Sequence, residues 1–170
     1  MSLTRSHRLI LALMVLSVLL AACAGSTAST TTAEAHDEHG EGVPFGEPGH
    51  AADADRIIDI DANDDFTFGP TDINVSSGET ITFRITNTGS LPHDFTLGDQ
   101  ETQDAHEAEM AEMMENGEMT MHDEANAVAL VSGETKDLTW HFTDSGTVLI
   151  GCHQTGHYEA GMKGAVTVDS

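Results

Sequence analysis

The sequence predicts an all-β fold, an antiparallel Greek-key β-sandwich or barrel of about eight strands with one short helical insertion. Residues 80–86 alternate, with Ile81, Phe83 and Ile85 on one face, which is the period of a half-buried strand. From Arg56 onward, short β-branched and aromatic runs recur between clusters of turn residues. The roughly 115 residues from position 56 to 170 are enough for one hydrophobic core and too few for two.

The expected strands follow these β-branched and aromatic runs, and turn residues such as those at 76–79 and 144–146 separate them. Gly69-Pro70 interrupts the second run without ending it. In chain order, we place the strands at residues 56–61, 66–75, 80–87, 93–97, 127–131, 136–142, 147–152 and 165–168.

The segment from 99 to 125 breaks the all-β pattern. Residues 104–116 predict a short helix, with Asp104 as its N-cap and Gly117 as its stop. One helical face carries a histidine and three methionines, and more soft donors follow; the set is His106, Met110, Met113, Met114, Met119, Met121 and His122. Thioethers and imidazoles bind Cu(I), so these residues are a candidate secondary Cu(I) site. The interpretation we favour is an apolar stripe that packs on the sandwich.

The first 22 residues have the pattern of a secretory signal: Arg5 and Arg8, an apolar stretch, and small residues at its end. Cys23 directly after Leu-Ala-Ala resembles the lipobox of bacterial lipoproteins, whose mature chain begins with a lipid-modified cysteine. The alternatives are an ordinary signal peptide or an uncleaved anchor. We expect an exported protein held by lipid on the extracytoplasmic side of the cell membrane, with residues 23–55 as a disordered tether.

Loss of residues 1–22 removes two arginines and no acid, which changes the formal charge from −23 to −25. Because a chain this acidic repels nucleic acid and anionic membrane surfaces, we expect no nucleic-acid partner. We expect contact with the membrane only through the lipid. A partner with a basic face, or simply solubility in a saline habitat, would explain the charge equally well. If Cys23 carries lipid, Cys152 is a lone thiol in an oxidising compartment, and a metal-ligand role explains it best.

Cys152, His157 and Met162 lie on one short segment with four residues between each pair, just after the apolar run 147–150. A second imidazole, from His93 at the start of a strand, would complete a trigonal His₂Cys site with a weak axial methionine. That ligand set favours copper. Gly156, Gly161 and Gly164 would allow the bends that a tight ligand loop needs.

These residues resemble the cupredoxins, the blue-copper family of plastocyanin and azurin, over residues 56–98 and 126–170. The resemblance implies one copper per domain, with His93 as the early ligand, Cys152 as the thiolate, His157 as the second imidazole and Met162 as the axial thioether. Thr155 stands where many relatives have proline. Strand alternation would turn His153 to the opposite face, at the surface. We expect His141 to be structural or solvent-facing.

The resemblance implies a one-electron carrier at the outer face of a membrane, a monomer that exchanges electrons with a redox partner through the exposed ring edge of His157. The alternative is extracytoplasmic copper storage, delivery or resistance that uses the Met/His-rich insertion. We do not expect an enzyme, because the sequence has no paired His-x-His motifs for a multicopper cluster and no hydrolase, nucleotide-binding or zinc-protease motif.

Overall fold

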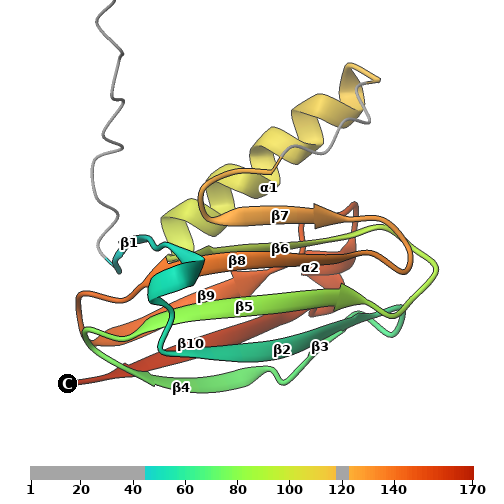
Figure 1. Cartoon of the computed structure of the whole chain (residues 1–170). Coiled ribbons are helices and arrows are strands. Elements are labelled where there is room, and N and C mark those ends of the chain that lie inside the picture. Colours follow the sequence, from blue (N-terminus) through green and yellow to red (C-terminus); the bar gives the residue numbers. More distant parts are fainter. Residues whose placement is uncertain (1–44, 118–122) are drawn as a thin grey trace, which may run out of the picture. The chain divides into compact units, whose positions relative to one another are not determined.

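The computed structural model describes residues 45–117 and 123–170, in which two five-stranded sheets pack as a sandwich (Figure 1). One sheet has the order β1-β8-β5-β2-β3 and the other β4-β10-β9-β6-β7. The strands are β1 (Glu47–Pro48), β2 (Arg56–Asn63), β3 (Thr67–Gly69), β4 (Asp72–Ser76), β5 (Thr80–Asn87), β6 (His93–Gly98), β7 (Ala127–Leu130), β8 (Thr135–His141), β9 (Gly146–Gly151) and β10 (Lys163–Asp169). The predicted all-β class is therefore confirmed.

Two features of the strands differ from the prediction. The run at 66–75 is two strands, and β3 and β4 belong to different sheets, so the chain crosses between sheets around Pro70, which has no N–H to give to a ladder. In addition, the pairs β2–β5 and β4–β10 are parallel, whereas purely antiparallel pairing was expected. Sequence alternation shows which face of a strand is buried but not the direction of its neighbour.

The core lies between the sheets and includes Ile81, Phe83 and Ile85, all fully buried as the alternation predicted. Each such side chain contributes about 1.5–3 kcal/mol to folding through burial. On the other face of β5, the Thr82 hydroxyl pairs with the Thr139 hydroxyl of β8 at 2.8 Å, so a polar contact satisfies this face.

The predicted tether is wrong for residues 45–55, which fold against the domain. Phe45 is buried and stacks on Trp140 with ring centroids 5.4 Å apart, and β1 pairs with β8. A 3₁₀ turn at Ala51–Asp53 then leads into β2. A single phenylalanine was the only sequence signal for this ordering. The rest of the predicted tether and signal, with Cys23, and the predicted donors Met119, Met121 and His122 lie outside the described residues.

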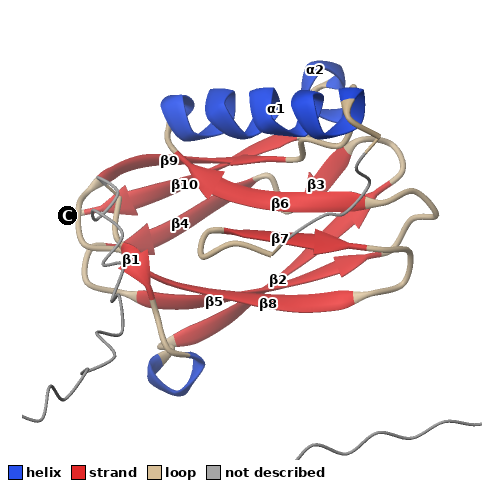
Figure 2. Cartoon of the chain, turned by 90° about the horizontal axis from the view of Figure 1, so that it is seen from above, coloured by secondary structure: helices blue, strands red, loops and turns tan. Residues whose placement is uncertain are grey.

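Helix α1 (Gln100–Glu115) begins earlier than predicted and lies outside the sandwich beside β6 (Figure 2). Its N-cap is Asp99, whose carboxylate accepts the Thr102 backbone N–H at 2.9 Å; Asp104, the predicted cap, lies inside the helix. The helix ends at Glu115 with Asn116 as its C-cap, and Gly117 has a positive φ, so the predicted stop is confirmed. Within the described ranges, no helix is both long and apolar enough to span a membrane. A second helix, α2 (His157–Ala160), is one turn long.

Candidate metal centre

The four predicted copper ligands come from two stretches that the fold brings together. His93 begins β6, and Cys152 directly follows β9, which pairs with β6 through the register Thr96 to Gly151. The Cys152 Sγ lies 3.3 Å from His157 Nδ1 and 3.8 Å from His93 Nδ1, and all three side chains are buried. Two imidazole nitrogens therefore face one sulfur, as a trigonal His₂Cys centre requires.

Backbone hydrogen bonds close the ligand loop and bring Met162 back to the cysteine. The Cys152 N–H donates to the Met162 carbonyl at 3.1 Å, and the Met162 N–H donates to the His157 carbonyl at 3.0 Å. Gly156 and Gly161 have φ angles of +80° and +103°, so the predicted bends at both positions are confirmed. Gly164 does not form a bend of the ligand loop. It lies in β10, where a Cβ would come within 2.6 Å of the Thr71 carbonyl oxygen.

Asp94, next to His93, organises the cysteine from the other side. Its backbone N–H points at Cys152 Sγ at 3.4 Å, and its buried carboxylate accepts the His153 backbone N–H at 2.9 and 3.0 Å. Burial raises the pKa of this carboxyl above its ordinary value. These contacts fix the peptide after Cys152 and give the sulfur a hydrogen bond that tunes a bound metal.

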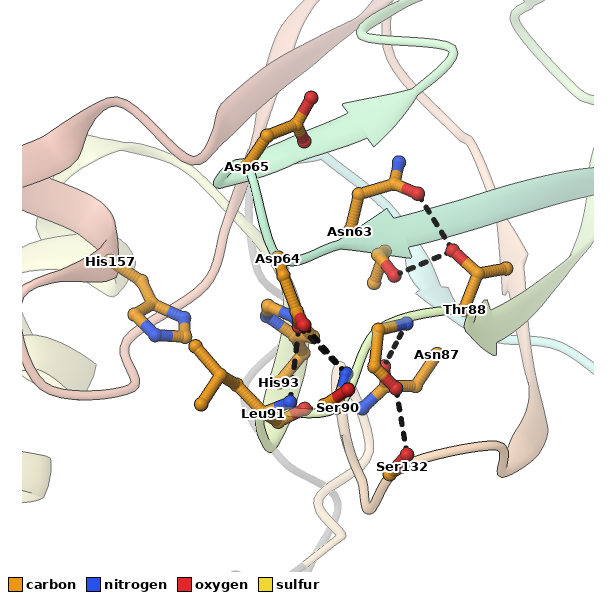
Figure 3. Close-up of polar contacts among 12 residues, drawn as sticks. Asn63, Asp64, Asp65, Asn87, Thr88, Ser90, Leu91, His93, Ser132 and His157 are labelled. Atoms are coloured by element: carbon orange, nitrogen blue, oxygen red, sulfur yellow. Dashed lines mark hydrogen bonds and ion pairs between the residues drawn. The ribbon is translucent and has the colours of Figure 1, made fainter.

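Asp64 supports His93 and its loop, as Figure 3 shows. The Asp64 carboxylate accepts the backbone N–H groups of Ser90 and Leu91 at 2.8 to 3.0 Å, and these bonds lower its pKa. Its Oδ1 lies 3.5 Å from His93 Nε2, which makes no hydrogen bond of regular geometry within the described residues. Gly89 is required here because a Cβ would collide with this carboxylate. Asp64 thus orients the outer nitrogen of His93 so that Nδ1 faces the sulfur.

Burial also sets the protonation of the donors. It lowers the pKa of His93 and of His157, so both imidazoles are neutral and can act as ligands near neutral pH. Burial raises the pKa of the Cys152 thiol far above its ordinary value, so a metal must displace this proton. With Met162 fully buried beside them, the donors are soft and borderline, and they fit copper.

The prediction that His153 lies at the surface was wrong. This side chain is 1% exposed and forms the main attachment of α1. Its Nδ1 pairs with the Glu107 carboxylate and its Nε2 with the Gln103 side-chain oxygen, both at 2.7 Å, and its ring stacks on Tyr158. The alternation did turn His153 away from the copper ligands, but α1 covers that face. His141 is structural, since its Nδ1 pairs with the Thr80 hydroxyl at 3.0 Å.

Sequence reasoning missed Asp64, Asp94 and Gln103 as residues that support the site. The Gln103 amide donates to the Thr96 carbonyl at 3.1 Å and to the Leu149 carbonyl at 3.3 Å, which pins α1 to β6 and β9. Asp94 could have been found from its place beside a ligand histidine on a strand. Nothing in the local sequence distinguishes Asp64 or Gln103 from neighbouring polar residues.

The predicted Met/His face divides into two parts. Met110, Met113 and Met114 line one groove of about 520 Å³ together with Leu91 and the copper ligand His157. His106 is not among the residues that line this groove, and its ring packs edge-on against His153, with ring centroids 5.0 Å apart. The stripe that we favoured is only partly packed, because Met114 remains 50% exposed. His157 itself is 7% exposed, so its ring is not the open edge that we expected.

A buried His₂Cys set with a methionine beside it, built on a two-sheet sandwich, defines a blue-copper protein. Residues 54–169 match the copper binding proteins of the plastocyanin/azurin family, and the chain belongs to that family. His93, Cys152, His157 and Met162 form its type 1 copper site. The copper assignment predicted from the sequence is confirmed.

The chain also resembles copper-resistant cuproproteins CopI over most of its length. The Pseudomonas aeruginosa protein is 35% identical, with 92% of this chain and 93% of that protein covered. The Rubrivivax gelatinosus protein is 34% identical, with 92% of this chain and 94% of that protein covered. The Vibrio cholerae protein is 34% identical, with 69% of this chain and 68% of that protein covered. These matches extend well beyond the ligand loop.

Solved structures of auracyanins share the fold. Auracyanin B superposes with a TM-score of 0.58 at 21% identity, over 76% of this chain and 97% of that one. Dithionite-reduced auracyanin from Roseiflexus castenholzii superposes with a TM-score of 0.55 at 24% identity, over 69% of this chain and 99% of that one. At these identities the likeness supports the cupredoxin-like sandwich alone.

Proposed function

We propose that this protein handles copper outside the cytoplasm and contributes to copper resistance. The observation that carries the proposal is the groove in which three thioethers of α1 and the ligand His157 line the same space. The similarity to copper-resistant cuproproteins CopI over 92% of the chain supports it independently.

The groove places soft donors beside one ligand of the type 1 site. His157 is almost buried, and the groove beside it is lined by Met110, Met113 and Met114 of α1 and by Leu91. Thioethers prefer Cu(I) to harder ions, so these methionines would hold Cu(I) next to a ligand of the type 1 centre. The Met114 sulfur also contacts the Thr155 hydroxyl, which joins α1 to the ligand loop.

A Cu(I) titration with a chromophoric chelator as competitor tests the proposal. Wild-type protein should bind more than one Cu(I), and Met110→Leu, Met113→Leu and Met114→Leu together should remove the extra equivalent. Leucine nearly preserves volume, so stability should change little. Val131→Ala, which alters the same groove without loss of sulfur, is the control. One Cu(I) per chain in both wild type and triple variant would refute copper handling by α1.

Copper tolerance of cells tests the biological role. In cells that lack the protein, the wild-type gene should restore growth in copper, whereas Cys152→Ser and the triple methionine variant should restore less. Equal tolerance with and without the protein, at matched expression, would argue against a resistance function.

We also propose that Cys23 carries lipid and holds the domain on the outer side of the membrane, as a monomer. The Leu-Ala-Ala-Cys sequence supports this. Cys23→Ala should move the protein from the membrane fraction to the soluble fraction. Continued sedimentation with membranes would favour an uncleaved apolar anchor.

A one-electron carrier is the second candidate, and the close approach of three buried donor atoms supports it. Donors held by a packed core limit rearrangement between oxidation states. The formal charge of −23 favours a basic redox partner. Fast electron exchange with a basic cytochrome that slows as salt rises would support this role, and exchange at a slow, salt-independent rate would oppose it.

A further inference from the structure

We propose a second metal site, for a divalent ion, built from His106 and Glu109 of α1 and Glu124 in the turn before β7. It lies outside the type 1 centre, and it differs from the thioether groove in donors and in oxidation state. It goes beyond the proposed function, which does not depend on it.

One ligand atom from each residue lies within 4.8 Å of the others, which is close enough for one ion to join them. The His106 side chain is only 11% exposed, and its Nδ1 is 3.9 Å from Glu109 Oε2, beyond hydrogen-bond length. Within residues 45–117 and 123–170, neither ring nitrogen of His106 makes a hydrogen bond. A nearly buried imidazole that faces two carboxylates and has no hydrogen-bond partner among the described residues is chemically incomplete.

The acidic residues next to the cluster, unlike Glu124, make side-chain hydrogen bonds. Glu107 pairs with His153, and Asp123 pairs with Lys136 at 2.8 Å and with the Ala129 backbone N–H at 3.0 Å. Among the described residues, the Glu124 carboxylate has no such bond. Its backbone is nonetheless fixed, because Glu124 and Ala127 exchange two backbone hydrogen bonds. The turn therefore holds the Glu124 carboxylate close to the His106 imidazole, and neither group makes a hydrogen bond among the described residues.

There is space for an ion and a path to it. The three residues line a cavity of about 20 Å³, which has room for about one water-sized sphere, together with Asp94, Met110 and Met113. The same three residues also border an open groove of about 450 Å³ on the solvent side, which Glu101 and Asn126 help to line.

Charge and donor type select the ion. Between Arg84 and Lys136 the sequence has twelve acidic residues and no Lys or Arg, so a cation would relieve repulsion there. One imidazole with two carboxylates suits divalent transition ions, and among these Cu²⁺ binds most tightly at a site of given geometry. Cu(I) would instead favour the sulfur-lined groove. The protein would thus hold the two oxidation states of copper at different places on α1.

Cu²⁺ titration of the full chain, followed by electron paramagnetic resonance, tests the site. Beyond the type 1 signal, wild type should show a second signal typical of tetragonal nitrogen and oxygen ligation. Glu109→Gln with Glu124→Gln should weaken binding of this copper at least tenfold, and His106→Gln should remove its nitrogen coupling. The thiolate absorption of the type 1 site should persist in every variant.

Glu112→Gln with Glu115→Gln is the matched control, since both acids are exposed on the same helix and should leave the second signal unchanged. An equal loss of the second signal in this control would mean that copper responds to the overall negative charge of α1 and not to a specific site. A second signal of undiminished affinity in the Glu109/Glu124 variant would overturn the proposal and assign that copper to other histidines. Absence of any second signal in wild type would also overturn it.

Discussion

The type 1 centre and the cluster of His106, Glu109 and Glu124 offer metals opposite environments. The first is enclosed, since each of its ligands is at most 7% exposed, and it gathers sulfur and imidazole donors from the start of β6 and from the segment between β9 and β10. The second is open to solvent on one side and gathers one imidazole and two carboxylates from a helix and a turn. His153 joins them, because it follows Cys152 in the chain while its ring packs against His106.

The difference shows how a single added helix can extend a small copper domain. The enclosed centre depends on the sandwich core, whereas α1 is attached mainly by polar contacts of Gln103 and Glu107 with His153, Thr96 and Leu149. Those contacts bring the methionines of α1 to the ligand His157 without burying them in the core. Soft donors then remain accessible beside a ligand that is itself hidden.

The largest effect should follow from Cys152→Ser. This change removes the only thiol of the enclosed centre, so the strong visible absorption of thiolate bound to Cu²⁺ should disappear completely. The cluster around His106 should still bind Cu²⁺. An optical titration with Cu²⁺ measures both points, and an unchanged visible spectrum would refute the role of Cys152.

Acid should weaken copper binding at the enclosed centre. Burial raises the pKa of the Cys152 thiol, so copper binding must release this proton throughout the neutral range. Burial lowers the pKa of His93 and His157, so proton competition from these imidazoles begins only below their ordinary pKa of about 6.5. As the pH is lowered, the affinity for copper should therefore fall about tenfold per pH unit above the ordinary imidazole pKa and more steeply below it.

Chelator competition at a series of pH values measures this slope. Cys152→Ser is the control, because loss of the thiol should remove the slope above the ordinary imidazole pKa. An affinity of wild type that does not vary with pH would contradict the buried thiol described here.

Gln103→Ala should loosen α1 without loss of the copper ligands. It leaves the buried His153 Nε2 and the Thr96 carbonyl without their partner, at a cost of about 1–3 kcal/mol in unfolding free energy. Urea unfolding measures the change. Gln100→Ala is the control, since Gln100 is exposed and bonds only within the helix. Equal stability of the two variants would mean that these contacts do not hold α1.

Met162→Leu should have the smallest effect. A weak axial thioether adjusts the centre rather than forming it, so the visible absorption should remain. The reduction potential should rise by on the order of 60 mV, which equals about a tenfold change in relative affinity for the two oxidation states. Protein-film voltammetry measures the potential, and complete loss of copper would contradict an axial role.

The sandwich and the ligand loop could be predicted from the sequence because both depend on local patterns, and the resemblance to the cupredoxins added His93 from a distant stretch. The alternation around Ile81 and Phe83 identified a strand, and the donor spacing from Cys152 to Met162 identified the ligand loop. The environment of His153 could not be predicted, because it depends on where α1 lies. The same is true of the His106 cluster, since Glu124 lies fifteen residues beyond Glu109 and meets it only through the fold.

X-ray absorption at the copper edge of protein loaded with one equivalent of copper would identify the ligands of the type 1 centre directly. We expect a first coordination shell of one short copper–sulfur bond and two imidazole nitrogens, from Cys152, His93 and His157. A shell of nitrogen and oxygen alone, or a sulfur contribution that persists in Cys152→Ser, would contradict it.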